Sequence, residues 1–261
     1  MLFSVITVTW NNLEGIKATH ASLLGQDSKN WEWIIIDGNS TDGTKEWLKQ
    51  LNLSACRWVS EPDSGIFDAM NKGISKAEAD YIIFMNAGDE FYADNTLSDI
   101  ENQIAKQTTK PLFIYGDAID FTTEGNSFLK KAKSHKLLYK TMFTSHQSMF
   151  FNRTFGEKHN VRYPLEYKIT GDYAYIALFL KNISNDSAVL KLDFPFCRFL
   201  LGGTNEIHRY KALKEDYKIR REIMGMGYVN AKKLYVMHFL HTKIKKNIPV
   251  IARILRYKKN V

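Results

Sequence analysis

The feature that most constrains the fold is an alternation of short apolar runs and helical patterns along the first half of the chain. The runs "LFSVITVT", "WEWIIID", "CRWVSE" and "ADYIIFMNAGD" are each followed by a segment with helical character. Alternation at this spacing is typical of βαβ units that build a parallel sheet. A strand buried on both faces of such a sheet is continuously apolar, as residues 33–36 are. We therefore predict an α/β protein whose mainly parallel central sheet is flanked by helices.

Polar residues stand where the predicted strands end. Right-handed crossover connections place the carboxyl ends of these strands on one edge of the sheet, where ligands bind in open α/β folds. The residues expected to converge there are Thr9, Asn11, Asp37, Glu61, Asp63, Asn86 and Asp89. Asp37 is followed by the turn formers "GNSTDG". Asp37 or Asp42 could contact a ligand or only cap the helix that follows, and the sequence leaves both interpretations open.

The same edge lacks the known phosphate-binding loops. The chain has no G-x-G-x-x-G after its first strand and no G-x-x-x-x-G-K-[ST]. Acidic side chains do not bind phosphate directly, but they can hold a divalent cation that does. In "FMNAGDEF", Asp89 follows a strand and a glycine turn, which predicts a ligand for Mg²⁺ or Mn²⁺. The alternative is a turn or capping aspartate.

The pattern changes after "KPLFIYGD". Residues 119–151 indicate short strands and loops, and "TGDYAYIALFLKN" predicts a helix that begins near Thr170. "AVLKLDFPFCRFLLGG" predicts a strand that Pro195 forces to an edge or a bend. From about Asn205 the chain is helical and basic. We predict a catalytic domain over residues 1–205, with halves 1–118 and 119–205, and a helical tail over 206–261.

Charge is unevenly distributed along the 261 residues. Residues 208–261 hold 15 Lys and Arg against three Asp and Glu, a charge of +12, whereas the remainder holds 21 against 25. The two cysteines, Cys56 and Cys197, have no metal-ligand spacing and favour a reducing compartment. The run "MLFSVITVTW" is predicted to be the first strand and not a signal peptide. No stretch has the roughly 18 uninterrupted apolar residues of a membrane span.

The basic tail contains an amphipathic pattern. Its apolar positions at helical spacing are Val236, Met237, Leu240, Ile244, Ile248, Ile251 and Leu255. Lysines and arginines surround them, and Pro249 should kink or split the helix. A basic amphipathic helix with aromatic residues favours a membrane surface. Packing against the catalytic domain and binding of nucleic acid are the alternatives.

Seven segments occur together in an order that carries a family resemblance. They are "SVITVTWNN", "WEWIIIDGNSTDGT", "SEPDSGIFDAMNKGI", "YIIFMNAGDEF", "SHQSMFFNR", "YPLEYKITGDYAYIALFL" and "FLLGGTN". Over residues 2–205 the chain resembles family 2 glycosyltransferases of the GT-A fold. Within that family it is most similar to colanic-acid-type enzymes of exopolysaccharide biosynthesis.

The resemblance implies roles for individual residues. It implies donor-site roles for Thr7, Thr9, Asp37, Asp68, Asn71 and Asn86. Asp37 would recognise the base, Asp89 would bind the metal, and Asp172 would be the general base. His146 and Gln147 could line the acceptor or diphosphate site, although His146 could equally be a packed core residue. Two segments depart from the usual pattern, because Asp37-Gly38-Asn39-Ser40 lacks a second acid and Asn86-Ala87-Gly88-Asp89 has only one.

The function expected from this resemblance is inverting sugar transfer. The donor would be a UDP- or GDP-linked sugar, and the acceptor an undecaprenyl-type lipid-linked repeat unit at the cytoplasmic face of the inner membrane. Asp172 would accept the proton of the acceptor hydroxyl, although it could equally be the cap of its helix. A nucleotidyltransferase would share acids and a metal at the sheet edge. A nucleic-acid-binding protein would use the basic tail but leaves the acidic motifs unexplained, so no nucleic-acid partner is expected.

Overall fold

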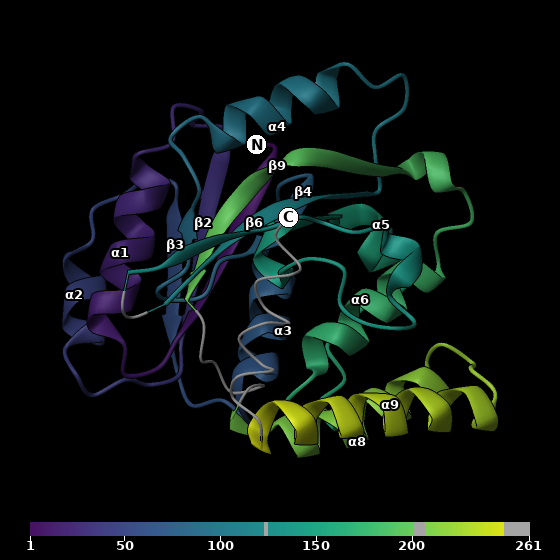
Figure 1. Cartoon of the computed structure of the whole chain (residues 1–261). Coiled ribbons are helices and arrows are strands. Elements are labelled where there is room, and N and C mark those ends of the chain that lie inside the picture. Colours follow the sequence, from purple (N-terminus) through teal and green to yellow (C-terminus); the bar gives the residue numbers. More distant parts are fainter. Residues whose placement is uncertain (123–124, 201–206, 248–261) are drawn as a thin grey trace.

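A mixed sheet of nine strands forms the centre of the molecule. The computed structural model describes residues 1–122, 125–200 and 207–247. The strand order is β3-β2-β1-β4-β8-β6-β9-β5, with β7 paired to β6 (Figure 1). The strands are β1 (Phe3–Thr9), β2 (Trp31–Asp37), β3 (Cys56–Ser60), β4 (Tyr81–Phe84), β5 (Glu90–Phe91), β6 (Phe113–Phe121), β7 (Ser127–Lys130), β8 (Met149–Asn152) and β9 (Val189–Leu200).

Helices cover both faces of the sheet and form a pair at one end (Figure 1). The helices are α1 (Leu13–Leu24), α2 (Thr44–Gln50), α3 (Ile66–Lys76), α4 (Thr96–Ala105), α5 (Arg153–Lys158), α6 (Gly171–Lys181), α8 (Arg209–Glu222) and α9 (Tyr228–Asn247). Short 3₁₀ turns span His135–Leu137, His146–Ser148 and Asp186–Ala188. Helices α1, α2 and α4 contribute to one hydrophobic core, and α3, α6 and α8 contribute to the other. The result is a three-layer α/β/α arrangement.

Strand β1 lies at the middle of both cores, and alternation of its side chains explains why. Ile6 and Val8 pack toward α3, whereas Phe3 and Val5 pack toward α1, so every residue of the strand is buried. Helix α3 lies directly on β1, because a Cβ added at Gly73 would come within 2.4 Å of the Ile6 side chain. This close contact fixes the height of α3 above the sheet.

Strand direction follows the sequence prediction in the first half of the chain and departs from it in the second. Strand β1 pairs in parallel with β2 and β4, and β2 pairs in parallel with β3. Strand β8 then runs antiparallel to both β4 and β6. Pro195 lies opposite Asp117, where the register between β6 and β9 shifts. The bend predicted at Pro195 is therefore present as a shift in register. Strand β9 is not the edge of the sheet, because β5 pairs with its other side.

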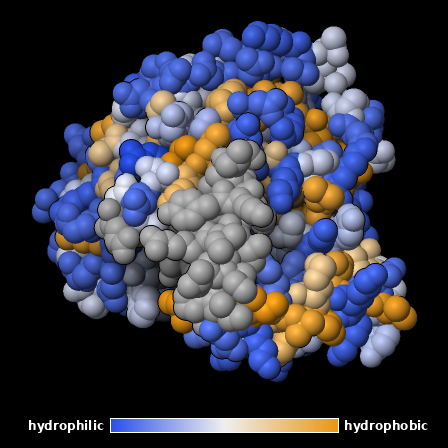
Figure 2. Space-filling model, in the orientation of Figure 1, coloured by the Kyte–Doolittle hydropathy of each residue, from blue (hydrophilic) through white to orange (hydrophobic). Residues whose placement is uncertain are grey.

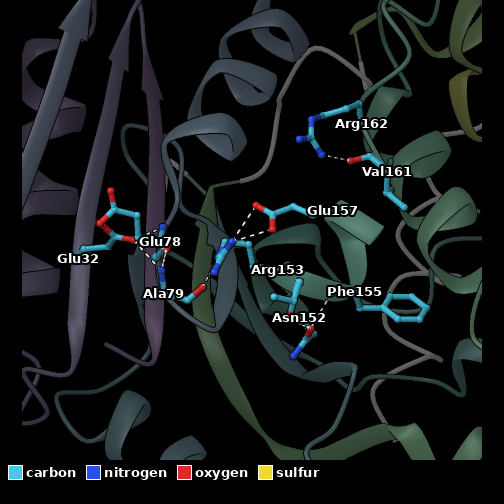
Figure 3. A network of polar contacts seen from close by, with 11 residues as sticks. Glu32, Glu78, Ala79, Asn152, Arg153, Phe155, Glu157, Val161 and Arg162 are labelled. Atoms are coloured by element: carbon cyan, nitrogen blue, oxygen red, sulfur yellow. Dashed lines mark hydrogen bonds and ion pairs between the residues drawn. The ribbon is translucent and has the colours of Figure 1, made fainter. Parts of the chain in front are cut away.

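Polar contacts tie the strands together at their amino ends, opposite the edge where the sequence predicts ligand binding. Glu32, near the start of β2, accepts hydrogen bonds from the N–H groups of Glu78 and Ala79 and from the Ser4 hydroxyl. Arg153 donates to Ala79 O at 2.8 Å and forms an ion pair with Glu157 (Figure 3). This end of the sheet is thus closed by its own side chains.

The C-terminal helices α8 and α9 pack on one another and on the α/β fold. Ala212, Leu213 and Ile219 of α8 are buried, and Tyr235 of α9 lies 6.0 Å from Tyr217 of α8 between ring centroids. No helix among the described residues is both long and apolar enough to cross a membrane. The boundary predicted near residue 205 falls in segment 201–206, and Ile248, Pro249, Ile251 and Leu255 follow α9. Both stretches lie outside the described residues.

Candidate active site

The carboxyl ends of β1, β2 and β3 meet in register, and Asp37 joins the loops that follow them. Thr9, Asp37 and Ser60 are paired across the three strands. The buried Asp37 carboxylate accepts hydrogen bonds from the Ser40 N–H and hydroxyl, and from the Ser60 hydroxyl at 2.6 Å. Asp37 does not cap the helix that follows. It lies at the predicted edge with each carboxylate oxygen already in contact with a serine.

The loop after β2 is held by its own polar residues. Asp42 accepts hydrogen bonds from Leu13 N–H at 2.9 Å and from the Thr44 hydroxyl at 2.6 Å. It therefore binds the first residues of both α1 and α2. Asn11 accepts from Thr41 N–H at 2.8 Å and has a φ of 47°, in the left-handed region that asparagine tolerates. These contacts fix the loops after β1 and β2 against one another.

The turn after β4 places Asp89 at the other side of β1. Asp89 Oδ2 accepts hydrogen bonds from Asn86 N–H at 3.0 Å and from Gln147 Nε2 at 3.0 Å. Gly88 supplies the positive φ of 102° that closes the turn. Burial raises the pKa of Asp89 to about 7, although the Gln147 hydrogen bond opposes the rise. The structure therefore brings Asn86, Asp89 and Gln147 together as predicted for a polar site.

The chemistry of this turn fits a divalent cation with few protein ligands. Among the described residues, the buried Asn86 Oδ1 accepts no hydrogen bond, and the buried Asp89 carboxylate has no cationic partner among its hydrogen bonds. Both are oxygen ligands of the kind that Mg²⁺ and Mn²⁺ prefer. Within the described residues, no three His, Cys, Asp or Glu side chains gather closely enough to form a complete metal site. Phosphate and water oxygens would have to complete the coordination shell.

Two predicted residues on α3 have structural contacts. Asp68 Oδ2 accepts a hydrogen bond from Ser64 N–H at 3.0 Å, in the turn that begins the helix. Asn71 donates to Tyr163 O at 2.9 Å and accepts from Tyr163 N–H at 2.8 Å. Asn71 therefore binds α3 to the segment that precedes α6.

Tyr163 is the centre of an aromatic cluster between the two halves of the domain. Its ring stacks on Tyr175 at 4.3 Å and on Phe67 at 5.4 Å between centroids. Its hydroxyl lies 2.9 Å from His146 Nε2, and burial lowers the pKa of His146 to about 3. His146 is therefore packed within this cluster, and its role at the acceptor or diphosphate site stays a prediction.

Asp172 lies in the first turn of α6 and is partly exposed. Its Oδ1 accepts a hydrogen bond from Tyr173 N–H at 2.8 Å. Burial raises the pKa of Asp172 to about 6, and the negative charge of Asp216 on α8 adds to the rise. A Cβ added at Gly171 would come within 2.6 Å of the Phe67 ring, so α6 begins directly against α3. Asp172 is thus held at the amino end of α6, where this helix adjoins α3.

The two threonines of β1 have different surroundings. Thr7 is fully buried, and its hydroxyl accepts a hydrogen bond from Trp33 Nε1 at 2.8 Å in the core below the edge. Thr9 lies at the edge, and its buried hydroxyl has no hydrogen-bond partner in the part of the chain that the structure describes. The donor-site geometry therefore favours Thr9 as the contact residue, with Thr7 supporting the strand.

Sequence patterns missed three features of this site. Trp10 is 70% exposed and lies beside Gly38, where an added Cβ would come within 3.3 Å of the indole. Ser60 completes the Asp37 contacts, and Glu215 of α8 binds the loop before α6. An exposed tryptophan directly after a buried strand was the one signal that could have been used.

Solved structures share this architecture. The chain superimposes on S. aureus TarS in complex with UDP-GlcNAc with a TM-score of 0.66 and 17% identity, covering 92% of this chain and 72% of that one. Mannosyltransferase PcManGT from Pyrobaculum calidifontis, in complex with GDP-Man and Mn²⁺, gives a TM-score of 0.63 at 14% identity, covering 98% and 79%. At such identities the likeness establishes the fold, and the predicted GT-A-like α/β arrangement is confirmed.

Curated relatives support the same assignment. An uncharacterised glycosyltransferase of Mycobacterium tuberculosis is 30% identical over 179 residues, or 66% of each chain. A PGL/p-HBAD biosynthesis glycosyltransferase of Mycobacterium bovis is 29% identical over 184 residues, 67% of this chain and 68% of that one. The chain spans about two thirds of the length of these relatives. Their names do not support the narrower resemblance to colanic-acid-type enzymes.

A family model extends over the half of the chain that carries the sheet edge. The model described as "Glycosyl transferase family 2" matches residues 4–160, from β1 through α5. The match includes Asp37, Asp89 and the strand ends that bring them together, which confirms the glycosyltransferase prediction at the level of the family. The chain belongs to glycosyl transferase family 2.

Proposed function

We propose that this protein transfers a sugar from a UDP- or GDP-linked donor to a lipid-linked acceptor, with inversion at the anomeric carbon. The observation that carries the proposal is the placement of Asp37 and Asp89. They lie at the ends of β2 and β4, the two parallel neighbours of β1. A crevice at such a switch in strand order is where α/β folds bind nucleotides.

The donor would lie across this edge. The loop that contains Asp37 and Gly38 would receive the base, and the exposed Trp10 indole beside Gly38 offers a surface for stacking. The buried Thr9 hydroxyl and Asn86 Oδ1, both without partners, would gain hydrogen bonds or a ligand. TarS and PcManGT are described in complexes with UDP-GlcNAc and GDP-Man, which supports a nucleotide sugar as donor.

The turn after β4 would be the diphosphate end of the site. Asp89 and Asn86 would hold Mg²⁺ or Mn²⁺, and Gln147 would orient Asp89 through its hydrogen bond. The bound cation would neutralise negative charge on the leaving diphosphate. Loss of the proton that Asp89 holds near neutral pH would accompany cation binding, because a metal ligand must be ionised.

Asp172 would supply the general base. Its carboxylate would accept the proton of the acceptor hydroxyl while the hydroxyl oxygen attacks the anomeric carbon. The bond between that carbon and the diphosphate oxygen would break on the opposite face, which inverts the configuration. A carboxyl pKa of about 6 suits this role, because the group is ionised at neutral pH and is more basic than an ordinary aspartate.

The exposed face of α9 would bind a membrane surface that carries the acceptor. Helix α9 packs on α8 through Ala231, Tyr235 and Phe239. Its opposite face exposes Val229, Val236, Met237, Leu240 and Ile244. Figure 2 shows apolar surface along the lower edge, where α9 lies. Exposed Lys232, Lys233 and Lys243 flank this face at helical spacing. Such a face suits the anionic cytoplasmic leaflet of the inner membrane, where an undecaprenyl-type lipid-linked acceptor of exopolysaccharide synthesis would be found.

The first prediction concerns Asp172. Asp172→Asn preserves the shape of the side chain and its capping ability but removes the proton acceptor, so sugar transfer should fall by about 10²–10⁴-fold. Nucleoside diphosphate affinity and melting temperature should stay near those of the wild type. In the wild type with saturating divalent cation, which keeps Asp89 ionised, kcat/KM should fall as pH drops below about 6, because the Asp172 carboxyl group becomes protonated.

This assay separates the competing assignments. Normal transfer by the Asp172→Asn variant would place the base elsewhere. A flat profile of wild-type kcat/KM across the same pH range would also contradict the assignment. Release of pyrophosphate in place of nucleoside diphosphate would identify a nucleotidyltransferase.

The second prediction concerns donor recognition by Asp37. Asp37→Ala should weaken nucleoside diphosphate binding by about 1.5–3 kcal/mol, the range for a hydrogen bond to a charged group. Calorimetry measures the affinity, and a urea unfolding curve identifies any loss of stability from the Ser40 and Ser60 hydroxyls, which lose the Asp37 carboxylate as hydrogen-bond acceptor. Asp42→Asn is the matched control in the same loop, since asparagine caps about as well as aspartate. Equal affinity in Asp37→Ala and wild type would leave Asp37 with only its role in joining the loops.

The third prediction concerns the exposed face of α9. Leu240→Glu places a negative charge among apolar residues without disturbing the α8 contact, because Leu240 is 51% exposed. It should reduce flotation with vesicles that contain anionic phosphatidylglycerol, while Leu24→Glu on α1 should not. Flotation of wild type that is equal with neutral and anionic vesicles, or absent from both, would contradict the membrane assignment. Salt-dependent binding to DNA would favour the nucleic-acid alternative.

A further inference from the structure

One carboxylate of α8 holds the loop that leads into α6. Glu215 Oε1 accepts a hydrogen bond from Lys168 N–H at 3.0 Å. Its Oε2 accepts from Ile169 N–H at 3.0 Å, from Thr170 N–H at 2.8 Å and from the Thr170 hydroxyl at 3.1 Å. Three consecutive backbone N–H groups thus converge on a single side chain that is 45 residues or more away in the sequence.

Glu215 binds the backbone immediately before α6. Thr170 is the N-cap residue of the helix; within the described residues its side chain makes no capping hydrogen bond to α6, and its hydroxyl donates to Glu215. A negative charge near the amino end of a helix is also favourable for the helix dipole. The backbone that leads into the first turn of α6, which contains Asp172, is therefore held by a residue of another helix.

Helix α8 is fixed firmly enough to act as a support. Arg220 is buried and donates to Tyr139 O at 2.8 Å and to Lys140 O at 3.2 Å, with its guanidinium over the Tyr173 ring. Glu222 accepts a hydrogen bond from the Tyr167 hydroxyl at 3.0 Å. The buried Arg220 thus fixes α8 to residues 139 and 140 and to the Tyr173 ring of α6, whereas the exposed Glu222 adds a single hydrogen bond.

We propose that Glu215 is a positioning residue that holds residues 168–170, and through them Asp172, in the geometry needed to deprotonate the acceptor. The inference rests on the proposed role of Asp172 as general base. Glu215 does not touch the substrate in this account. It acts by restraining the backbone two residues before the base, and a misplacement of about 1 Å can reduce a rate by about 10²-fold.

The test compares three substitutions of Glu215 with one control on the same helix. Glu215→Ala should lower kcat for sugar transfer by about 10–100-fold and leave nucleoside diphosphate affinity unchanged. Glu215→Gln, with its amide oxygen at the Oε2 position, keeps three of the four hydrogen bonds and should restore kcat to within about threefold of wild type. Glu222→Ala removes the Tyr167 contact and should retain kcat.

A second measurement does not depend on activity. Amide hydrogen exchange at residues 168–170 should be slow in wild type and faster in Glu215→Ala, with little change in Glu222→Ala. If Glu215→Ala does not fold, Glu215→Asp provides the same test, because it keeps the charge but is one methylene too short. It should show the same loss of kcat and the same faster exchange.

Several results would overturn the inference. These are normal kcat in Glu215→Ala or Glu215→Asp, unchanged exchange at residues 168–170, or an equal loss in Glu222→Ala. A different result would show that the proposed function itself fails: Asp172→Asn would then transfer sugar at the normal rate. An inactive Asp172→Asn together with active Glu215 variants would reject only the positioning role.

Discussion

The parallel pairing of β1 with β2 on one side and β4 on the other is the constraint on which the site depends. Chain order runs outward from β1 through β2 to β3 and returns on the far side as β4, so the loops after these strands separate at the end of β1. The acid that ends β2 and the acid in the turn after β4 therefore lie on either side of β1. Burial of every residue of β1, and the close contact of Gly73 with Ile6, make this arrangement rigid.

The acceptor side is coupled to this edge through packing and through one helix from the end of the chain. Tyr163 joins α3 to α6 by stacking between Phe67 and Tyr175, while Asn71 binds its backbone. On the other side of α6, α8 supplies Glu215. Helix α9 rests on α8, so a membrane bound to the exposed face of α9 would lie on a support shared with the proposed base. In the proposed function, the C-terminal helices would therefore both position the base and bind the membrane.

The sequence predicted the parallel half of the fold well, because its strands are continuous apolar runs with helical segments between them. It also predicted that Asp37 and Asp89 lie at one edge of the sheet, because chain order determines which strand ends become neighbours. The role of Asp172 came from the family resemblance and stays a prediction. It could not show that both Asp37 oxygens contact serines, or that His146 points into an aromatic cluster, because those facts depend on side-chain packing between distant segments. Glu215 was missed for the same reason. In sequence it is one acid in a basic helix, and its three backbone partners become visible only in three dimensions.

The most direct test of the central claim is a crystal structure with a nucleoside diphosphate and Mn²⁺, read by anomalous scattering of the metal. The account predicts a manganese peak within about 2–2.5 Å of an Asp89 oxygen. It also predicts the diphosphate beside the turn after β4 and the base between the loops that follow β1 and β2. A nucleotide bound away from the end of β1, or a manganese ion bound without Asp89, would contradict it.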